Sequence, residues 1–410
     1  MIGILFWLSV LFIVYTYAGY PLLLALLART RKPRPPYPDH TPTVTILIAA
    51  FNEEQVIAHK IENCLALDYP ADKLQILVLN DASDDRTAEI VNGYAQKGVE
   101  LYTAPKRVGK LINVNHGVTL ARGEIVLISD ATNLYSPDAL RHLVKPFSDP
   151  RVGGAFGSRQ IVRGDGALGD SEGLYWKYES FIQANETRLG TSTNAFGDIY
   201  AIRRELYEAP TPGVINDDFI LTMRLLKRGS QVIYAPLART HERISPTAQD
   251  EITRRSRMIA GRYQAIFQFG HLLPLRRPML VWQILSHKFF RPLVPFAMLL
   301  AVLTNLAALV FPPTAGSWRW LWLAPPFNWV LLGLHCALLP VFLCLLRMDE
   351  ASPPGIDELA IGDLRQPRDQ RRATGKLPDV RPCRHEGFLG EIVGQMHVAT
   401  EVRQQSIHPL

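Results

Sequence analysis

Residues 43–54 read TVTILIAAFNEE, an apolar run that passes directly into a polar loop. A short apolar run rich in β-branched residues is typical of a buried strand. The same arrangement returns in LQILVLNDASDD at residues 74–85 and in EIVLISDATN at residues 124–133. We therefore expect three buried strands, at Thr43–Ala50, Gln75–Leu79 and Glu124–Ser129.

Helical patterns separate these strands, at Glu53–Leu65, Asp84–Gln96 and Lys110–Ala121. Regular alternation of strands and helices is typical of an α/β fold, and here it predicts a parallel, doubly wound sheet. Ligands of such sheets bind at the carboxyl ends of the strands. The polar side chains that follow the strands therefore indicate a nucleotide site.

Two familiar nucleotide-binding motifs are missing. The segment Gly153–Ser158 contains glycines, but they do not have the spacing of a dinucleotide-binding loop. The segment Gly109-Lys110-Leu111 lacks the hydroxyl residue and the earlier glycine of a phosphate-binding loop. The sequence thus gives little support to a dehydrogenase or a P-loop nucleotidase.

Hydrophobic residues make up 48% of the 410-residue chain, but they are unevenly distributed. Gly3–Leu27 is nearly uncharged and exceeds the roughly 20 residues that a helix needs to cross a bilayer. Pro292–Phe311 and the proline-containing Leu321–Leu346 are the second and third predicted spans. A signal peptide is the alternative for the first segment, but the basic leader and the small-residue cleavage site are missing.

With the N-terminus outside, three clusters of basic residues fall on the same side of the predicted spans. They are Arg29, Arg31, Lys32 and Arg34 after the first span, Arg276, Arg277, Lys288 and Arg291 before the second, and Arg347 after the third. The positive-inside rule then places residues 35–291 and the C-terminal tail in the cytoplasm of a multi-pass protein of the cell membrane. The expected organisation is a membrane helix at 1–29, a soluble domain at 43–268, an interfacial segment at 271–291, two membrane helices at 292–346 and a disordered tail at 348–410.

Composition argues against several classes of protein. Lysines and arginines exceed acidic residues by 44 to 38, but much of this excess lies beside apolar segments, as expected for contact with membrane lipids rather than with nucleic acid. The four cysteines contain no C-x-x-C spacing that would suggest zinc, and Cys336 and Cys344 lie inside an apolar run. Free thiols in a reducing compartment are the simpler interpretation.

Taken in order, the polar motifs resemble the inverting family-two glycosyltransferases, especially the membrane branch of cellulose, chitin, hyaluronan and poly-N-acetylglucosamine synthases. The matching elements are Phe51–Glu54, Asp81 with Ser83 and Asp85, Gly109-Lys110 with Asn113, Asp130, Gly197–Arg204, Asp217-Asp218 and Arg254–Arg257. The resemblance covers about Thr43–Gln268 and the flanking spans. It implies a GT-A-like α/β domain that binds a nucleotide-sugar, with transmembrane helices on either side.

The resemblance also implies a donor site. Asp130 is similar to the first acid of a metal-binding D-x-D motif, although Thr132 replaces the second acid, so we expect Mg²⁺ or Mn²⁺ beside the donor diphosphate. Asp81 is similar to the residue that contacts uracil. A helix cap at Asp130 and a turn at Asp81 are the structural alternatives. The expected donor-binding residues are Glu53, Asp81, Lys110, Asp130 and Arg257.

On the acceptor side, Asp218 takes the position of the base that deprotonates the attacking hydroxyl. A negative charge at a helix N-terminus would be the alternative explanation for it. Gly197, Asp198 and Arg254 match acceptor-side positions of the family. Met258 stands where the family's Q-x-x-R-W element has tryptophan. This predicts short products or single-sugar transfer, unless another aromatic residue such as Trp176 or Tyr263 provides the stacking surface.

The resulting hypothesis is a membrane-bound, inverting hexosyltransferase that moves a sugar from a nucleotide-sugar, expected to be a UDP-sugar, to a growing polysaccharide. Transfer of one sugar to a polyprenyl phosphate or another lipid is the alternative. A polysaccharide product leaves room for accessory export subunits as partners. A non-catalytic scaffold and a transporter are weaker, because the acidic motifs are intact and the spans carry few polar groups.

Overall fold

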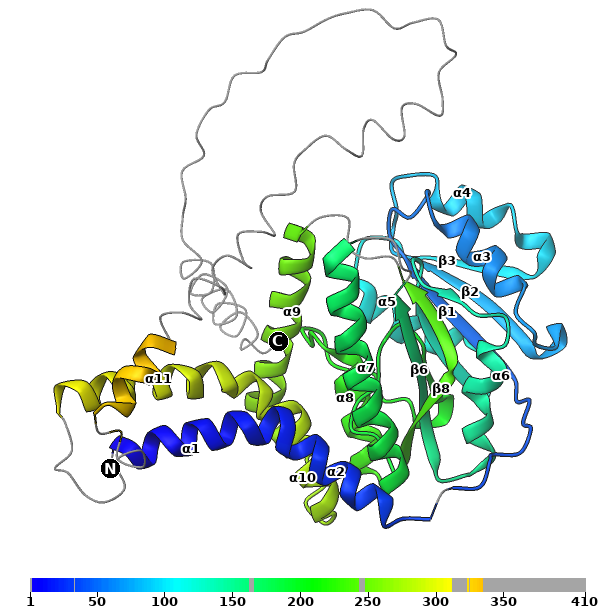
Figure 1. The fold of residues 1–410 in the computed structure, drawn as a ribbon. Coiled ribbons are helices and arrows are strands. Elements are labelled where there is room, and N and C mark those ends of the chain that lie inside the picture. The colour runs from blue at the N-terminus through cyan, green and yellow to red at the C-terminus, as the bar shows by residue number, and fades with distance from the viewer. Residues whose placement is uncertain are drawn as a thin grey trace, which may run out of the picture. The chain divides into compact units, whose positions relative to one another are not determined.

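The computed structural model describes residues 2–32, 34–161, 166–242, 248–311, 323 and 325–334 (Figure 1). Most of the predicted third span, Arg347 and the predicted disordered tail lie outside the described residues. The same holds for Cys336, Cys344 and Cys383, whereas Cys64 is a free, buried thiol.

The predicted strands form the first half of an eight-stranded sheet. They are β1 (Val44–Ala50), β2 (Leu74–Asn80) and β4 (Ile125–Asp130), and β3 (Val99–Thr103) joins them at the edge. All four pair in parallel in the order β3-β2-β1-β4. The carboxyl ends of β1, β2 and β4 therefore lie together, with their polar loops beyond them.

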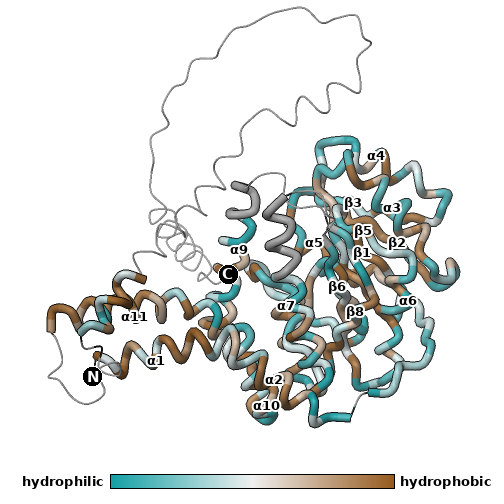
Figure 2. The backbone as a smooth tube through the Cα atoms, in the orientation of Figure 1, coloured by the Kyte–Doolittle hydropathy of each residue, from teal (hydrophilic) through white to brown (hydrophobic). Residues whose placement is uncertain are grey.

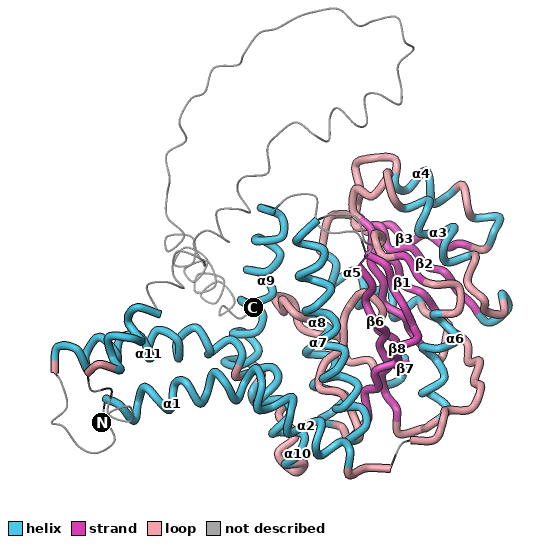
Figure 3. Tube along the Cα trace, in the orientation of Figure 1, coloured by secondary structure: helices cyan, strands magenta, loops and turns pink. Residues whose placement is uncertain are grey.

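The second half of the sheet is mixed, so the prediction of a wholly parallel sheet is wrong there. It contains β7 (Tyr200–Arg203), β6 (Val152–Ile161), β8 (Gln231–Glu242) and β5 (Leu134–Tyr135), in that spatial order beyond β4. Strand β7 runs antiparallel to both β4 and β6. Figure 3 shows the strands of the sheet in magenta with helices along it. At Gly157 of β6 the neighbouring strand approaches so closely that a Cβ atom would lie 2.1 Å from the carbonyl oxygen of Ala238.

Two hydrophobic cores form because successive residues of a strand point to opposite faces. Ile46 and Ile48 of β1 face a core shared with α3 (Ile57–Leu65), α4 (Thr87–Asn92) and α6 (Ala139–Val144). Leu47 faces the other core, shared with α5 (Lys110–Leu120), α8 (Asp217–Lys227) and α10 (Pro278–Ile284). Helices on both faces confirm the predicted α/β class.

Within the part of the chain that the structure describes, two helical stretches have the length and apolarity needed to cross a membrane, Ile2–Arg29 and Arg291–Val310. The first consists of α1 (Ile2–Val14), the π-helical turn η1 (Tyr15–Gly19) and α2 (Tyr20–Arg29), and the second contains η8 (Arg291–Leu293) and α11 (Val294–Val310). Helices α1 and α11 lie side by side (Figure 1) and are largely hydrophobic (Figure 2). Many of their large apolar side chains are exposed, including Leu11 and Leu299, which is unfavourable in water.

The apolar helices are attached to the sheet domain by two long helices and a short helical segment. These are α7 (Gly166–Leu189), α9 (Ala248–Gln268) and the succession of η6 (Gly270–Leu272), α10 and the π-helical η7 (Leu285–Phe289). Tyr20 and Leu24 of α2 pack against Ile182 of α7. In the predicted interfacial segment, Leu280 and Ile284 of α10 are buried in the core that α5 and α8 share with the sheet.

Candidate functional site

A cavity of about 280 Å³ lies at the carboxyl ends of β1, β2 and β4. Its lining residues are Ala49, Ala50, Phe51, Glu53, Asp81, Lys110, Asn113, Asp130, Ala131 and Thr132. Four of the five residues predicted to bind the donor are therefore brought together here. The fifth, Arg257, lies exposed on α9 and is not among the lining residues.

Hydrogen bonds between the loops after β1 and β2 shape one wall of this cavity. The backbone N–H of Asn52 donates to Ser83 Oγ (3.0 Å), and Asp84 N–H donates to Asn52 Oδ1 (3.1 Å). Glu54 N–H donates to Asp85 Oδ2 (3.0 Å). Asn52 has a φ of 55°, a left-handed conformation that asparagine tolerates better than most residues. The F-N-E-E and D-x-S-x-D motifs thus act locally by holding two strand-end loops together.

Asp81 is buried and organises a third loop. Its Oδ1 accepts a hydrogen bond from Val108 N–H, and its Oδ2 accepts one from Gly109 N–H, both at 2.8 Å. Gly109 has a φ of +89°, which side chains other than glycine rarely adopt, and α5 begins at the next residue. Asp81 therefore positions Lys110 at the cavity. A contact between Asp81 and a base stays a prediction.

Charges of both signs meet inside the cavity. Lys110 Nζ forms an ion pair with Asp130 Oδ1. Although burial would lower the pKa of Lys110, the carboxylates of Asp130, Asp217 and Asp218 raise it above its ordinary value. Burial, followed by the charges of Asp130 and Asp85, raises the pKa of Glu53. Lys110 therefore lies between the cavity and the acidic pair that begins α8.

The carboxylates suit a divalent ion whose coordination the substrate completes. Among the described residues, no three His, Cys, Asp or Glu side chains form a group that could hold a metal by itself. Mg²⁺, however, is usually bound through one or two carboxylates, several waters and the substrate phosphates. Asp130 and Glu53 are close enough for the charge of one to raise the pKa of the other. They fit this second type of site, with Thr132 exposed beside them.

Asp218 lies in the first turn of α8. Its Oδ1 accepts a hydrogen bond from Phe219 N–H (2.6 Å), and its Oδ2 accepts one from Gly197 N–H (3.3 Å). Burial first, and the neighbouring charge of Asp217 second, raise the pKa of Asp218 to about 6. A carboxylate with a raised pKa that remains largely ionised at neutral pH has the properties of a general base.

Asp198 is engaged by a residue that the sequence did not suggest. Its carboxylate forms an ion pair with Arg159 of β6, and the two side chains are only 11% and 8% exposed. The Arg159 guanidinium also lies 4.7 Å from the ring centre of Trp176, which meets Phe196 edge-on at 4.9 Å. Asp198 therefore anchors an Arg–aromatic cluster next to Gly197. Only the aromatic and basic character of these separate segments could have signalled it.

Helix α9, which carries Arg254 and Arg257, is fixed to the loop that precedes Asp217. Asn216 Nδ2 donates to the carbonyl oxygen of Met258 (3.1 Å). A Cβ atom at Gly261 would lie 2.5 Å from the Asn216 side chain, so the helix and the loop are in close contact. The arginines of α9 are thus near the start of α8 rather than in the lining of the cavity.

Comparisons with known proteins agree with this geometry. Residues 45–209 match the model of the family "Glycosyl transferase family 2". The chain is 26% identical over 257 residues to "Probable glycosyltransferase YdaM" of Bacillus subtilis, covering 59% of this chain and 61% of that protein. It is 24% identical over 252 residues to the poly-beta-1,6-N-acetyl-D-glucosamine synthase of Staphylococcus aureus, covering 59% and 60%. The chain thus spans about 60% of the length of these curated relatives.

Among solved structures, the mannosyltransferase PcManGT from Pyrobaculum calidifontis, in complex with GDP-Man and Mn²⁺, is similar with a TM-score of 0.63 and 24% identity. The similarity covers 82% of this chain and 92% of that one, and it supports the fold. The family match includes the strands β1, β2 and β4 and the loops that line the cavity. Residues 45–209 therefore match a family-2 glycosyltransferase domain, and the fold around them is GT-A-like α/β.

Proposed function

We propose that this glycosyltransferase moves a hexose from a nucleotide-sugar to an acceptor at a membrane, with inversion at the anomeric carbon. The observation that carries the proposal is the position of Lys110, which pairs with Asp130 in the cavity and is also influenced by the carboxylates of Asp217 and Asp218. The ammonium of Lys110, which can offset the charge of the leaving diphosphate, is thus close enough to Asp218, a carboxylate of raised pKa, for their charges to interact.

On the donor side, Asp81 holds the loop that presents Lys110, and the Lys110 ammonium offsets the charge that grows on the diphosphate as it leaves. Mg²⁺ or Mn²⁺, bound through Asp130 and the donor phosphates, would supply further positive charge there. Glu53 and Asp81 line the same cavity. Arg257 lies on α9, outside the lining of the cavity, and would contact the diphosphate from that helix. A UDP-sugar is the proposed donor.

On the acceptor side, Asp218 accepts the proton of an acceptor hydroxyl while the oxygen attacks the anomeric carbon. One C–O bond forms on one face of the sugar as the bond to the diphosphate oxygen breaks on the opposite face, which inverts the configuration. The nucleoside diphosphate leaves with the bonding electron pair, and the proton stays on Asp218. Gly197, Asp198 and Arg254 would line the path of the acceptor.

The proposed acceptor is a growing polysaccharide, in keeping with the similarity to the staphylococcal synthase. The two long apolar helices and the basic flanks support a cell-membrane protein whose sheet domain is cytoplasmic. Single-sugar transfer to a lipid-linked acceptor is the second candidate. It is favoured by Met258, which is 38% exposed on α9 and offers no aromatic face to a sugar.

The proposal is tested by incubating membranes that contain the protein with a panel of nucleotide-sugars and weighing the products by mass spectrometry. Sugar incorporation with release of nucleoside diphosphate is expected for the wild type and not for Asp218→Asn. A ladder of masses would support a polysaccharide, and a single addition to an extracted lipid would support the second candidate. Absence of transfer from every donor would contradict the proposed function.

A further inference from the structure

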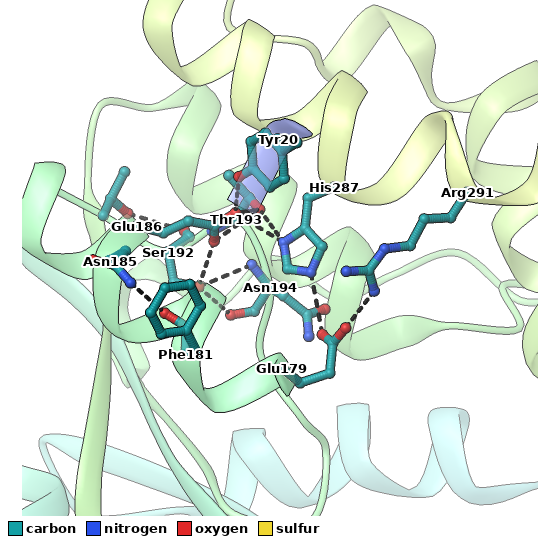
Figure 4. A network of polar contacts seen from close by, with 11 residues as sticks. Tyr20, Glu179, Phe181, Asn185, Glu186, Ser192, Thr193, Asn194, His287 and Arg291 are labelled. Atoms are coloured by element: carbon teal, nitrogen blue, oxygen red, sulfur yellow. Dashed lines mark hydrogen bonds and ion pairs between the residues drawn. The ribbon is translucent and has the colours of Figure 1, made fainter. Parts of the chain in front are cut away.

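Four charged side chains are buried together where the apolar helices join the sheet domain (Figure 4). Glu179 and Glu186 come from α7, and His287 and Arg291 come from η7 and η8. His287 Nδ1 lies 2.8 Å from Glu186 Oε1, and His287 Nε2 lies 3.1 Å from Glu179 Oε2. Arg291 forms an ion pair with the other oxygen of Glu179.

The geometry fixes the charges in this cluster. An ionised carboxylate only accepts hydrogen bonds, so both ring nitrogens of His287 must donate, and the ring is an imidazolium. Burial would raise the pKa of Glu179 and Glu186, but the charge and hydrogen bonds of His287 lower both. The charge of Arg291 adds to this at Glu179, and hydrogen bonds from Thr193 and Tyr20 add to it at Glu186. Two carboxylates are thus balanced by His287 and Arg291, which makes their burial tolerable.

Glu186 connects three parts of the chain. Its Oε1 accepts a hydrogen bond from the hydroxyl of Tyr20 (2.7 Å), which belongs to the N-terminal apolar stretch. Its Oε2 accepts bonds from Thr193 N–H (2.8 Å) and Ser192 Oγ (3.0 Å). With His287 from η7, these donors fully occupy the carboxylate. One buried side chain therefore joins the N-terminal apolar stretch, η7 and the loop after α7.

This loop leads to the proposed base. Residues 191–199 contain neither helix nor strand, so their conformation depends on bonds made by side chains such as Glu186. Thr193 is fixed by Glu186, and four residues later Gly197 N–H donates to Asp218 Oδ2. The segment between them is short, so a displacement at Thr193 is transmitted to Gly197.

We propose that Glu186 is a positioning residue: through Ser192 and Thr193 it holds Gly197 against Asp218, and Tyr20 and His287 tie this arrangement to the membrane helices. The inference rests on the proposed role of Asp218 as the base. It predicts that the state of the N-terminal apolar helix influences the chemical step, although that helix lies outside the donor cavity. Tyr20 and Glu186 act through the loop and touch neither substrate.

Loss of the Gly197 N–H has a specific consequence. A carboxylate that loses a hydrogen-bond donor holds its proton more tightly, so the acid limb of the pH–rate profile moves to higher pH. Asp218 also faces Asp217 of its own helix, Lys110 of α5 and Lys288 of η7, and the variants below leave all three in place. Removing the negative charge of Glu186 would by itself move the limb to lower pH, so the direction of the shift separates the two effects.

The test compares Glu186→Gln and Tyr20→Phe with Tyr94→Phe in the full-length protein in membranes. Tyr94→Phe is the matched control, because Tyr94 also donates to a glutamate, Glu62 Oε1 at 2.9 Å, at a surface position. The measurements are kcat, the KM for the donor and the midpoint of the acid limb of the pH–rate profile. We expect kcat to fall about tenfold in Glu186→Gln and a few-fold in Tyr20→Phe, with the limb at higher pH and the donor KM unchanged.

The inference would be overturned if Glu186→Gln and Tyr20→Phe both behaved like Tyr94→Phe. In that case, kcat per folded molecule and the acid limb of the pH–rate profile would be the same in all three variants. A rise in donor KM with unchanged kcat would also overturn it, because the donor cavity would then be the site affected. If Glu186→Gln does not fold, Tyr20→Phe decides, because it removes one hydroxyl and no charge. Failure of the proposed function looks different: the wild type transfers no sugar, or Asp218→Asn stays active.

Discussion

Asp218→Asn should inactivate the protein and also stabilise it above pH 6. The pKa of Asp218 is about 6 against an ordinary value of 3.8, a difference of about 2 units. At about 1.4 kcal/mol per unit, folding disfavours the charged form by about 3 kcal/mol as an upper bound. Asparagine is always neutral, so it avoids this penalty. A weaker hydrogen bond to Gly197 N–H would lower the free energy of unfolding by about 1 kcal/mol and offset part of the gain.

The sign of the pH dependence follows from the raised pKa. The protonated form of Asp218 is favoured by folding, so its stabilising contribution is complete below the unfolded pKa and is lost as pH rises through about 6. We therefore expect Asp218→Asn to melt at a higher temperature than the wild type at pH 8 and at about the same temperature at pH 3.5.

The assay measures thermal unfolding in detergent at these two pH values, together with the transfer rate between pH 5 and pH 8. The wild-type base is about 90% ionised at pH 7 and about 9% at pH 5, so its rate should fall about tenfold between them. The variant should lose a factor of about 10²–10⁴ in rate. A wild-type acid limb near pH 4, or an active and destabilised Asp218→Asn, would refute the reasoning.

Three further outcomes are expected. Asp130→Ala should weaken donor binding that depends on Mg²⁺ or Mn²⁺, as measured by calorimetry, and chelation should stop turnover of the wild type; full activity after chelation would exclude the metal. Gly157→Ala should lower the free energy of unfolding by about 3 kcal/mol, because its methyl group would meet the Ala238 carbonyl, whereas Gly270→Ala, which has open space around it, should change little in the same melts. Lys97→Cys, in a background without native cysteines, should react with an impermeant maleimide only after cells are opened; labelling of intact cells would place the sheet domain outside.

The sequence predicted the parallel half of the sheet because β1, β2 and β4 are short apolar runs that end in polar loops. The predicted Gln75–Leu79 and the observed Leu74–Asn80 differ by one residue at each end. The mixed half gave no such signal. Strand β6 contains three glycines, of which Gly157 permits the close approach of β8, and β7 has only four residues. The pairing of these strands therefore depends on tertiary structure.

Local motifs likewise identified Glu53, Asp81 and Asp130 of the cavity, because each lies at or just beyond the end of a strand, and Lys110, because it begins a helix after a glycine. Contacts between distant segments were beyond this reasoning. Arg159 pairs with Asp198 across 39 positions, and Glu186 meets His287 across 101. In the sequence, Glu179 and Glu186 look like ordinary charged residues of a solvated helix face. Only the packing of α7 against η7 and η8 reveals that they are buried.

The stereochemistry of transfer tests the central claim most directly. With an α-linked nucleotide-sugar that the enzyme accepts, the anomeric proton of the newly bound sugar is followed by NMR from the first turnover. A single displacement assisted by Asp218 predicts a β-linked product from the wild type and none from Asp218→Asn. An α-linked product would contradict the account, because it would require either a covalent intermediate or attack from the face of the leaving group.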